Sequence, residues 1–225
     1  MGHGTDFEKF AASELRISAL QLNGYASRMV SSVNPTIIEE RELHAVAMDV
    51  FSRLMMDRII FLGEPIDDRV ANIVQAQLLY LASTDEKAEI SLYLNTPGGV
   101  VSAGLGIYDT MQLITPPVKT ICTGMAASMC AILLCAGEKG KRSALPHSRV
   151  MIHQPIGGAS GQASDILIEA KEIAKARTEL YEIIAKHSGQ PFDRITRDAD
   201  RDCWMTAREA VEYGMIDEIF GEKSL

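Results

Sequence analysis

A serine set among small residues is the first candidate for chemistry in this sequence. Ser128 follows Gly124-Met125-Ala126-Ala127 and precedes an apolar run at 129–134. The β-branched run at 118–122 and the glycine after it favour a sharp turn from a strand into a helix that begins near Ser128. At such a helix N-terminus, unpaired main-chain N–H groups and the positive end of the helix dipole stabilise an oxygen that gains negative charge. This setting favours a nucleophilic serine; the alternative is a serine that only caps a buried helix.

Acyl transfer by a serine also requires a base that takes its proton, and His153 is the candidate. It directly follows an apolar strand expected at 149–152. The remaining histidines lie in an N-terminal extension, in polar turns and at the end of a helix: His3, His44, His147 and His187. A purely structural histidine stays the alternative for His153.

The carboxylate that would orient this base is the least determined member of the set. Several aspartates follow His153, namely Asp165, Asp193, Asp198, Asp200 and Asp202. Only Asp202 adjoins an apolar patch, Cys203-Trp204-Met205, which could bury a carboxylate beside an imidazole. For the oxyanion, Gly98-Gly99 can present main-chain N–H groups without an obstructing side chain. An ordinary strand-to-helix turn is the alternative for this glycine pair.

Strands that alternate with helices are expected to position these residues. Apolar runs predict strands at 58–62, 90–94, 118–122, 142–145 and 149–152, and helical spacing predicts helices at 49–56, 70–81, 100–114 and 128–136. Such alternation is typical of an α/β fold with a mostly parallel sheet and right-handed crossovers. In these sheets catalytic groups gather at the carboxyl ends of strands. Three candidate segments follow strands in this way: 95–99, 123–128 and 153–155.

The C-terminal part begins with a glycine-rich segment at 157–161 and a long polar helix expected at 163–187. This helix is longer than one small core needs, and its apolar residues could pack on a partner subunit as well as on the chain's own sheet. It therefore predicts an oligomer. The tail is expected to form a helix at 206–213 and a strand at 215–220.

Composition excludes several classes of function. A chain of 225 residues is most naturally one domain, and its net charge of −8 offers no basic surface for nucleic acid or anionic membrane. The four cysteines lie in apolar settings without CxxC spacing, which indicates reduced core residues: Cys122, Cys130, Cys135 and Cys203. No apolar run reaches the roughly 18 to 20 residues that span a bilayer, and the N-terminus lacks an apolar signal core. We therefore expect a soluble, cytoplasmic protein.

Five motifs in order make the chain resemble the proteolytic subunits of the ATP-dependent Clp proteases, the ClpP family of serine peptidases (peptidase family S14). The motifs are FLGEPIDDRVANIVQAQLLYL, LNTPGGVVSAGLGIYDTMQ, TGMAASMCAILLCAGEKGKR, LPHSRVMIHQP and DRDCWMTAREAVEYGMID, and the resemblance covers about residues 33–220. It implies an α/β spiral of β-β-α units, as in the crotonases, with a projecting handle made of a strand and the long helix. It also implies a single peptidase domain at 33–225 and an N-terminal propeptide at 1–32, removed by self-cleavage near 31–33.

Carried over by position, the resemblance implies Ser128 as nucleophile, His153 as base and Asp202 as the orienting carboxylate. It implies the main-chain N–H groups of Gly99 and Met129 as oxyanion donors. Family members stack two heptameric rings and receive unfolded polypeptides from a Clp-type AAA+ unfoldase of the ClpX or ClpA/ClpC type. ATP is used by that partner, so no cofactor or metal is expected in this subunit.

Two positions depart from the family pattern. Thr96 stands where a serine is usual before the proline, and Cys130 stands where glycine or another small residue often follows the methionine. Neither change removes a catalytic group, but Cys130 could make the enzyme sensitive to oxidation. Two alternatives to a peptidase also stay open: a crotonase-type acyl-CoA enzyme, which shares the fold and the glycine donors, and a catalytically silent ring subunit.

Overall fold

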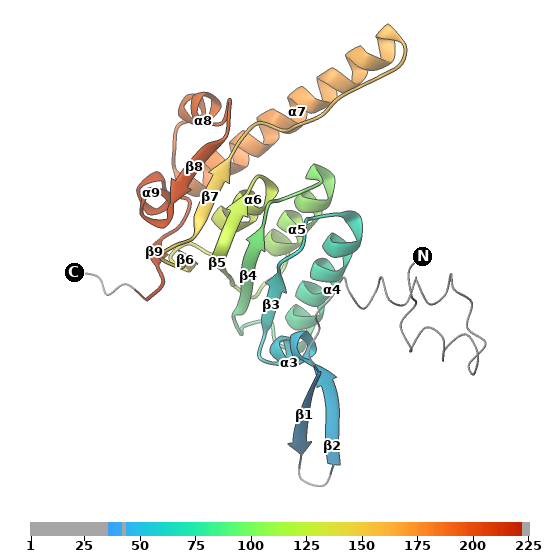
Figure 1. Ribbon diagram of the computed structural model, residues 1–225, viewed down its shortest axis with the longest axis vertical. Coiled ribbons are helices and arrows are strands. Elements are labelled where there is room, and N and C mark those ends of the chain that lie inside the picture. The colour runs from blue at the N-terminus through green and yellow to red at the C-terminus, as the bar shows by residue number, and fades with distance from the viewer. Residues whose placement is uncertain (1–35, 42–43, 222–225) are drawn as a thin grey trace, which may run out of the picture. The chain divides into compact units, whose positions relative to one another are not determined.

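The computed structural model describes residues 36–41 and 44–221 (Figure 1). The chain divides into two compact units, Met1–Arg53 and Leu54–Leu225. In the first unit, β1 (Thr36–Arg41) and β2 (His44–Asp49) form an antiparallel hairpin that the sequence analysis did not foresee. The helix α3 (Val50–Met56) follows in the chain, as predicted. The expected propeptide at 1–32 and its cleavage near 31–33 lie outside the described residues.

A mostly parallel sheet forms the centre of the second unit, which confirms the predicted α/β architecture. Five parallel strands run in the order β3 (Ile59–Leu62), β4 (Ile90–Thr96), β5 (Val118–Ala127), β6 (Arg142–Ala144) and β9 (Glu218–Ile219). The strand β7 (Arg149–Ile152) pairs in parallel with the second half of β5. The strand β8 (Cys203–Thr206), which the sequence analysis missed, pairs antiparallel with β7.

The strand β5 is longer than the predicted 118–122, and the extension brings it to Ser128. Asn95 Oδ1 accepts a 3.1 Å hydrogen bond from Met125 N–H, and residues 125–127 pair with β7. These bonds carry the strand past Gly124, where the composition favoured a stop. Thr96 is paired with Ala126 after a register shift in β4, so β4 and β5 both end beside Ser128.

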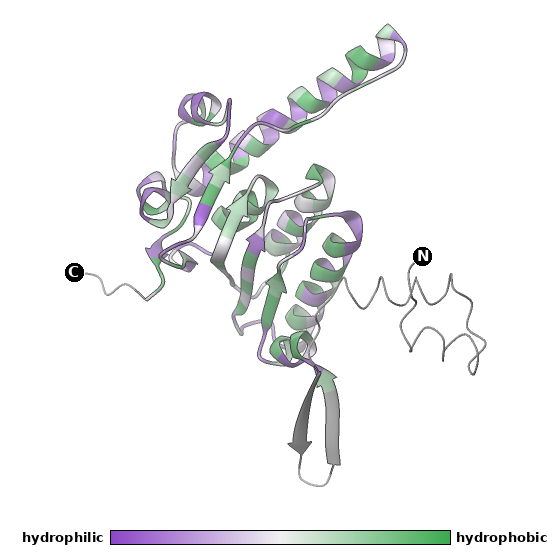
Figure 2. Ribbon diagram, viewed as in Figure 1, coloured by the Kyte–Doolittle hydropathy of each residue, from purple (hydrophilic) through white to green (hydrophobic). Residues whose placement is uncertain are grey.

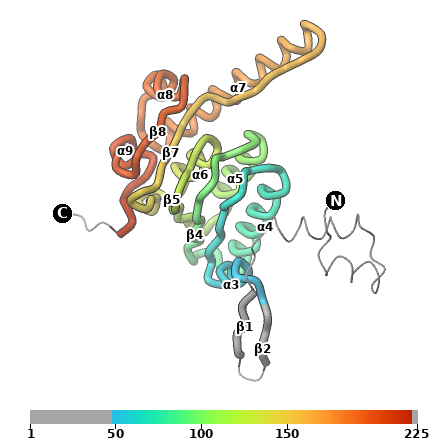
Figure 3. Tube along the Cα trace, viewed as in Figure 1, coloured from blue at the N-terminus to red at the C-terminus, as the bar shows by residue number. Residues whose placement is uncertain are grey.

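Three helices lie along one face of this sheet: α4 (Asp68–Thr84), α5 (Val101–Leu113) and α6 (Met129–Cys135) (Figures 1 and 3). Asp67 starts α4 earlier than predicted because its carboxylate caps the helix through Val70 N–H at 2.7 Å. Hydrophobic and hydrophilic bands alternate along α4 (Figure 2), as expected for a helix with one buried face. In contrast, α6 is apolar throughout and all of its residues are buried, which fixes its N-terminus firmly.

The long helix α7 (Ala163–Ser188) continues well beyond the sheet (Figure 1). Its buried residues lie near its C-terminal end: Leu180, Tyr181, Ile183, Ile184 and Ser188. The preceding segment at 153–162 forms no strand. The predicted strand half of the handle is therefore wrong for the single chain, in whose described part this backbone has no neighbouring strand to pair with.

Two short helices complete the described chain. The helix α8 (Phe192–Asp198) was not predicted, whereas α9 (Ala207–Tyr213) confirms the helix expected at 206–213. A capping box between Thr206 and Glu209 begins α9. The final strand is shorter than the expected 215–220, because only Glu218 and Ile219 pair with β6. None of the described helices combines the length and the apolar character needed to cross a bilayer.

Candidate active site

Ser128 occupies the turn between the end of β5 and the start of α6. Its backbone has φ 54° and ψ −124°, a conformation that non-glycine residues adopt only when the surroundings enforce it. A 2.9 Å hydrogen bond from Ser128 N–H to Met151 O and the buried α6 supply that constraint. The Ser128 side chain makes no capping hydrogen bond to α6. The alternative interpretation of Ser128 as a helix cap is therefore wrong.

The imidazole of His153 lies directly against this hydroxyl. Its Nε2 is 2.9 Å from Ser128 Oγ. The contact follows from strand pairing, because Ala127 is paired with Met151 and the parallel strands β5 and β7 end at the same edge of the sheet. With Nε2 unprotonated, the imidazole can accept the proton of the Ser128 hydroxyl. His153 is thus brought to the predicted position.

Asp202 completes a chain of three side chains. Its Oδ1 lies 3.1 Å from Nδ1 of His153. The antiparallel register pairs Ile152 with Cys203, so the residue after β7 and the residue before β8 are neighbours. A carboxylate at Nδ1 keeps the proton on that nitrogen and leaves Nε2 as the acceptor.

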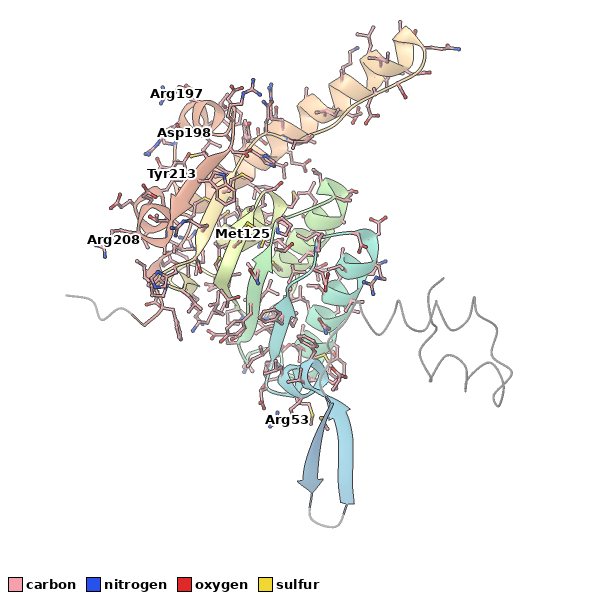
Figure 4. All side chains as sticks on the ribbon, in the orientation of Figure 1. Arg53, Met125, Arg197, Asp198, Arg208 and Tyr213 are labelled. Carbon is pink, nitrogen blue, oxygen red and sulfur yellow. The ribbon has the colours of Figure 1, made fainter. Side chains whose placement is uncertain are left out.

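The reason given for choosing Asp202 was nevertheless wrong. Its side chain is 60% exposed, and Trp204 is 50% exposed, so the apolar patch does not bury the carboxylate. Asp202 comes to lie beside His153 because of the β7–β8 register, which the sequence analysis did not predict. The other four candidate aspartates make no hydrogen bond or ion pair with His153, and Asp198 instead accepts a 3.1 Å hydrogen bond from the Tyr213 hydroxyl (Figure 4).

The glycine pair after β4 packs directly against the nucleophile turn. A Cβ at Gly98 would lie 2.8 Å from Ser128 Cβ and 2.9 Å from Met129 N, and the residue has φ +95°. A Cβ at Gly99 would lie 2.1 Å from Ile66 O. Only glycine permits either approach. The close packing of this loop therefore requires the glycine pair, which argues against the alternative of an ordinary strand-to-helix turn.

The hydrogen bonds of this loop leave one main-chain donor unused. Gly98 N–H donates to Thr96 Oγ1 at 3.3 Å, and Val100 N–H donates to Ile66 O at 2.8 Å. Within residues 36–41 and 44–221, Gly99 N–H has no hydrogen-bond acceptor, and the same holds for Met129 N–H at the start of α6. Two unused donors beside the Ser128 hydroxyl are what an oxyanion hole requires.

A cavity of about 240 Å³ opens beside these groups. Ser128, His153 and Gly99 form one side of it. The other walls are mostly apolar: Val101, Met129, Ile132, Ile152, Leu180, Tyr181 and Ile184 belong to them. The site therefore combines a reactive edge with a space that fits an apolar side chain.

Two contacts near the site were not anticipated. Asn95 holds the β5 extension through Met125 N–H, and Gln154 Nε2 donates a 2.8 Å hydrogen bond to Asp200 O. The second bond ties the segment after His153 to the segment before Asp202. Asn95 lies within the LNTPGG motif, which was the available signal; Gln154 had none beyond its place after His153.

The cysteines are structural. All four are free, and Cys122, Cys130 and Cys135 are buried. Burial raises the pKa of the Cys130 thiol, which disfavours the thiolate that oxidants attack. The structure therefore argues against the expected sensitivity of Cys130 to oxidation. Among the described residues, no group of three His, Cys, Asp or Glu side chains could hold a metal ion.

Comparisons with known proteins identify relatives over nearly the whole chain. Residues 41–223 match the protein family described as Clp protease. A protein of Bacteroides fragilis strain YCH46 is 63% identical over 97% of this chain and 99% of its own length. Proteins of Porphyromonas gingivalis and Bacteroides thetaiotaomicron are each 62% identical, over 95% and 97% of this chain and 96% and 99% of their own lengths. All three are described as ATP-dependent Clp protease proteolytic subunits.

Proposed function

The chain belongs to the Clp protease family, and on this premise we propose that it is a serine endopeptidase whose nucleophile is Ser128. It is the proteolytic subunit of an ATP-dependent Clp protease and hydrolyses unfolded polypeptides to short peptides. The observation that carries the assignment of residues is the contact chain Ser128 Oγ, His153 Nε2 and Nδ1, and Asp202 Oδ1, at 2.9 and 3.1 Å.

Hydrolysis proceeds in two acyl transfers. His153 Nε2 takes the proton of the Ser128 hydroxyl as Oγ attacks the peptide carbonyl, and the C=O electron pair moves onto the carbonyl oxygen. The N–H groups of Gly99 and Met129 stabilise that oxyanion. When the C–N bond breaks, the imidazolium gives its proton to the leaving amine. A water molecule, deprotonated by His153, then releases the acyl group from Ser128.

The chemistry of the cavity defines the preferred substrate side chain. Its walls carry apolar side chains from α6 and α7, among them Ile132, Leu180 and Ile184, and no Asp, Glu, Lys or Arg side chain lines it. An unpaired charge would be costly there. We therefore expect cleavage after medium-sized apolar residues, and a peptide library should show them ahead of Asp, Glu, Lys and Arg.

An ATPase partner and an assembly are implied by the family, and the finer arrangement is part of the proposal. The names of the relatives specify ATP dependence, and we infer a Clp-type AAA+ unfoldase that uses the ATP, with no cofactor in this subunit. We propose two stacked heptameric rings. In the single chain, Ile166, Leu167 and Ile168 are 40%, 62% and 61% exposed, and contact with another subunit would bury these apolar side chains.

Labelling of the purified protein by a fluorophosphonate tests this function. Intact mass spectrometry should show one adduct per chain in wild type and none in Ser128→Ala, with both proteins assembled to the same native mass. An unlabelled wild type that remains unreactive with an unfoldase present would support a catalytically silent subunit. A crotonase-type enzyme would turn over an acyl-CoA with Ser128 replaced, because enolate chemistry does not require this serine.

A further inference from the structure

The two positions that depart from the family pattern, Thr96 and Cys130, contact one another next to the oxyanion loop. Thr96 is the last residue of β4, and Cys130 is the second residue of α6. The main-chain N–H of Thr96 lies beside the Cys130 thiol, close enough to favour the ionised form of that group. Both side chains are 0% exposed, so water cannot replace either partner of this contact.

The hydroxyl of Thr96 makes a separate hydrogen bond within the loop after β4. Its Oγ1 accepts the N–H of Gly98 at 3.3 Å, a local turn of the kind that serine and threonine favour. This bond occupies the donor that precedes Gly99, while Ile66 O occupies the donor that follows it. Thr96 therefore helps to determine that Gly99, and no neighbour, presents an unused N–H to the site.

The contact between Thr96 and Cys130 spans the two segments that supply the oxyanion donors. Gly99 belongs to the loop after β4, and Met129, directly before Cys130, begins α6. Burial raises the pKa of the Cys130 thiol, so the group stays neutral and packs as a small apolar side chain with a weak acceptor. A fixed spacing of preorganised donors is what gives an oxyanion hole its effect.

We propose that Thr96 and Cys130 are positioning residues that set the spacing between Gly99 N–H and Met129 N–H. Neither touches the substrate; each acts through the donor next to it in the chain. This inference rests on the proposed peptidase function and deepens it. It predicts that changes at the pair alter stabilisation of the transition state and leave substrate binding almost unchanged.

The first test compares Thr96→Val, which keeps the shape and removes the acceptor, with Thr96→Ser, which keeps the hydroxyl. On a fluorogenic peptide, Thr96→Val should lower kcat about tenfold or more with KM within about twofold of wild type. Thr96→Ser should stay within about twofold of wild type in both constants. Affinity for a peptide aldehyde, whose hemiacetal oxygen occupies the same hole, should fall in proportion to kcat/KM. Equal kcat for the valine and serine variants, or a loss confined to KM, refutes the proposal.

A double-mutant cycle with Cys130→Ala tests the pairing itself. If the two residues act as one unit, the loss of kcat in the double variant should be clearly smaller than the product of the two single losses. Independent, multiplicative losses would overturn the pairing. Should Thr96→Val fail to reach the native assembly mass, Cys130→Ala carries the same aldehyde and KM comparison, because it removes the thiol that lies beside the Thr96 N–H.

The parent activity is measured in the same experiment. Absence of peptide hydrolysis by wild type relative to Ser128→Ala would refute the proposed peptidase. An active wild type with an unaffected Thr96→Val refutes only the positioning role.

Discussion

The buried ion pair between Arg142 and Asp217 should be a major determinant of stability, and Asp217→Asn tests it. The Arg142 side chain is 1% exposed, and its Nε and Nη2 donate to Asp217 at 2.9 and 2.6 Å. Its Nη1 donates to Cys135 O and His187 O at 3.0 and 2.8 Å. One guanidinium therefore joins the ends of α6 and α7 to the tail of the chain.

The magnitude follows from the charge state of Asp217. Partial burial opposes ionisation, but the hydrogen bonds from Arg142 outweigh it and lower the pKa of the carboxyl from 3.8 to about 2. That depression corresponds to roughly 2 kcal/mol, and a buried charge that loses its partner costs about 3–5 kcal/mol. We expect Asp217→Asn to lower the free energy of unfolding by about 3 kcal/mol at pH 7.

Urea unfolding at a fixed protein concentration provides the measurement, with Glu218→Gln as the control. Glu218 is the exposed neighbour with the same charge, so its replacement should change stability by less than about 0.5 kcal/mol. The stabilisation by ionised Asp217 is complete above its unfolded pKa near 3.8 and is lost as the pH falls toward its folded pKa of about 2. The gap between wild type and Asp217→Asn should therefore narrow from pH 5 to pH 3. A gap that stays constant, or a control that is equally destabilised, would refute the reasoning.

Three further outcomes are expected. Gly98→Ala should reduce peptide hydrolysis at least a hundredfold because its Cβ would lie 2.6 Å from a carbonyl oxygen and 2.8 Å from the nucleophile's Cβ, whereas Gly140→Ala, which also has positive φ but nothing within 4 Å, should keep activity. Asp202→Asn should lower kcat by about 10³-fold or more because the carboxylate that keeps the proton on Nδ1 is lost, whereas kcat for Asp200→Asn should change less than about threefold. Burial, with Lys186 and Arg142 nearby, lowers the pKa of His187 to about 4, so stability should fall as the pH drops from about 6.5 toward 4. His187→Gln should flatten that dependence in urea unfolding, and an unchanged slope would contradict this assignment.

The sequence predicts the α/β class and most elements because local composition controls them. The apolar run of α6 and the strand Arg149–Ile152 are found almost where they were expected. Elements that depend on distant partners were less predictable. On its own, the sequence leading into β8 shows only a change from polar to apolar residues. It becomes a strand because β7 offers an unpaired edge.

The residues of the site differ in the same way, since some follow from the local sequence and others depend on distant partners. Ser128 is marked by its neighbours in the chain, and Gly98-Gly99 by the need for backbone without Cβ. Asp202 was singled out by the apolar patch beside it and by family resemblance, but its contact with His153 depends on the register Ile152 to Cys203. No local pattern encodes that register, because it depends on how β8 pairs with the distant strand β7.

The helix α7 serves two purposes along its length, and this connects the active site with assembly. Near its C-terminal end, Leu180, Tyr181 and Ile184 form a wall of the cavity beside Ser128. Its first turns carry the exposed apolar residues Ile166, Leu167 and Ile168. The helix is continuous over 26 residues, so its exposed turns and the cavity wall belong to one element. We infer that contacts made by the exposed turns would act through α7 on the cavity wall beside Ser128.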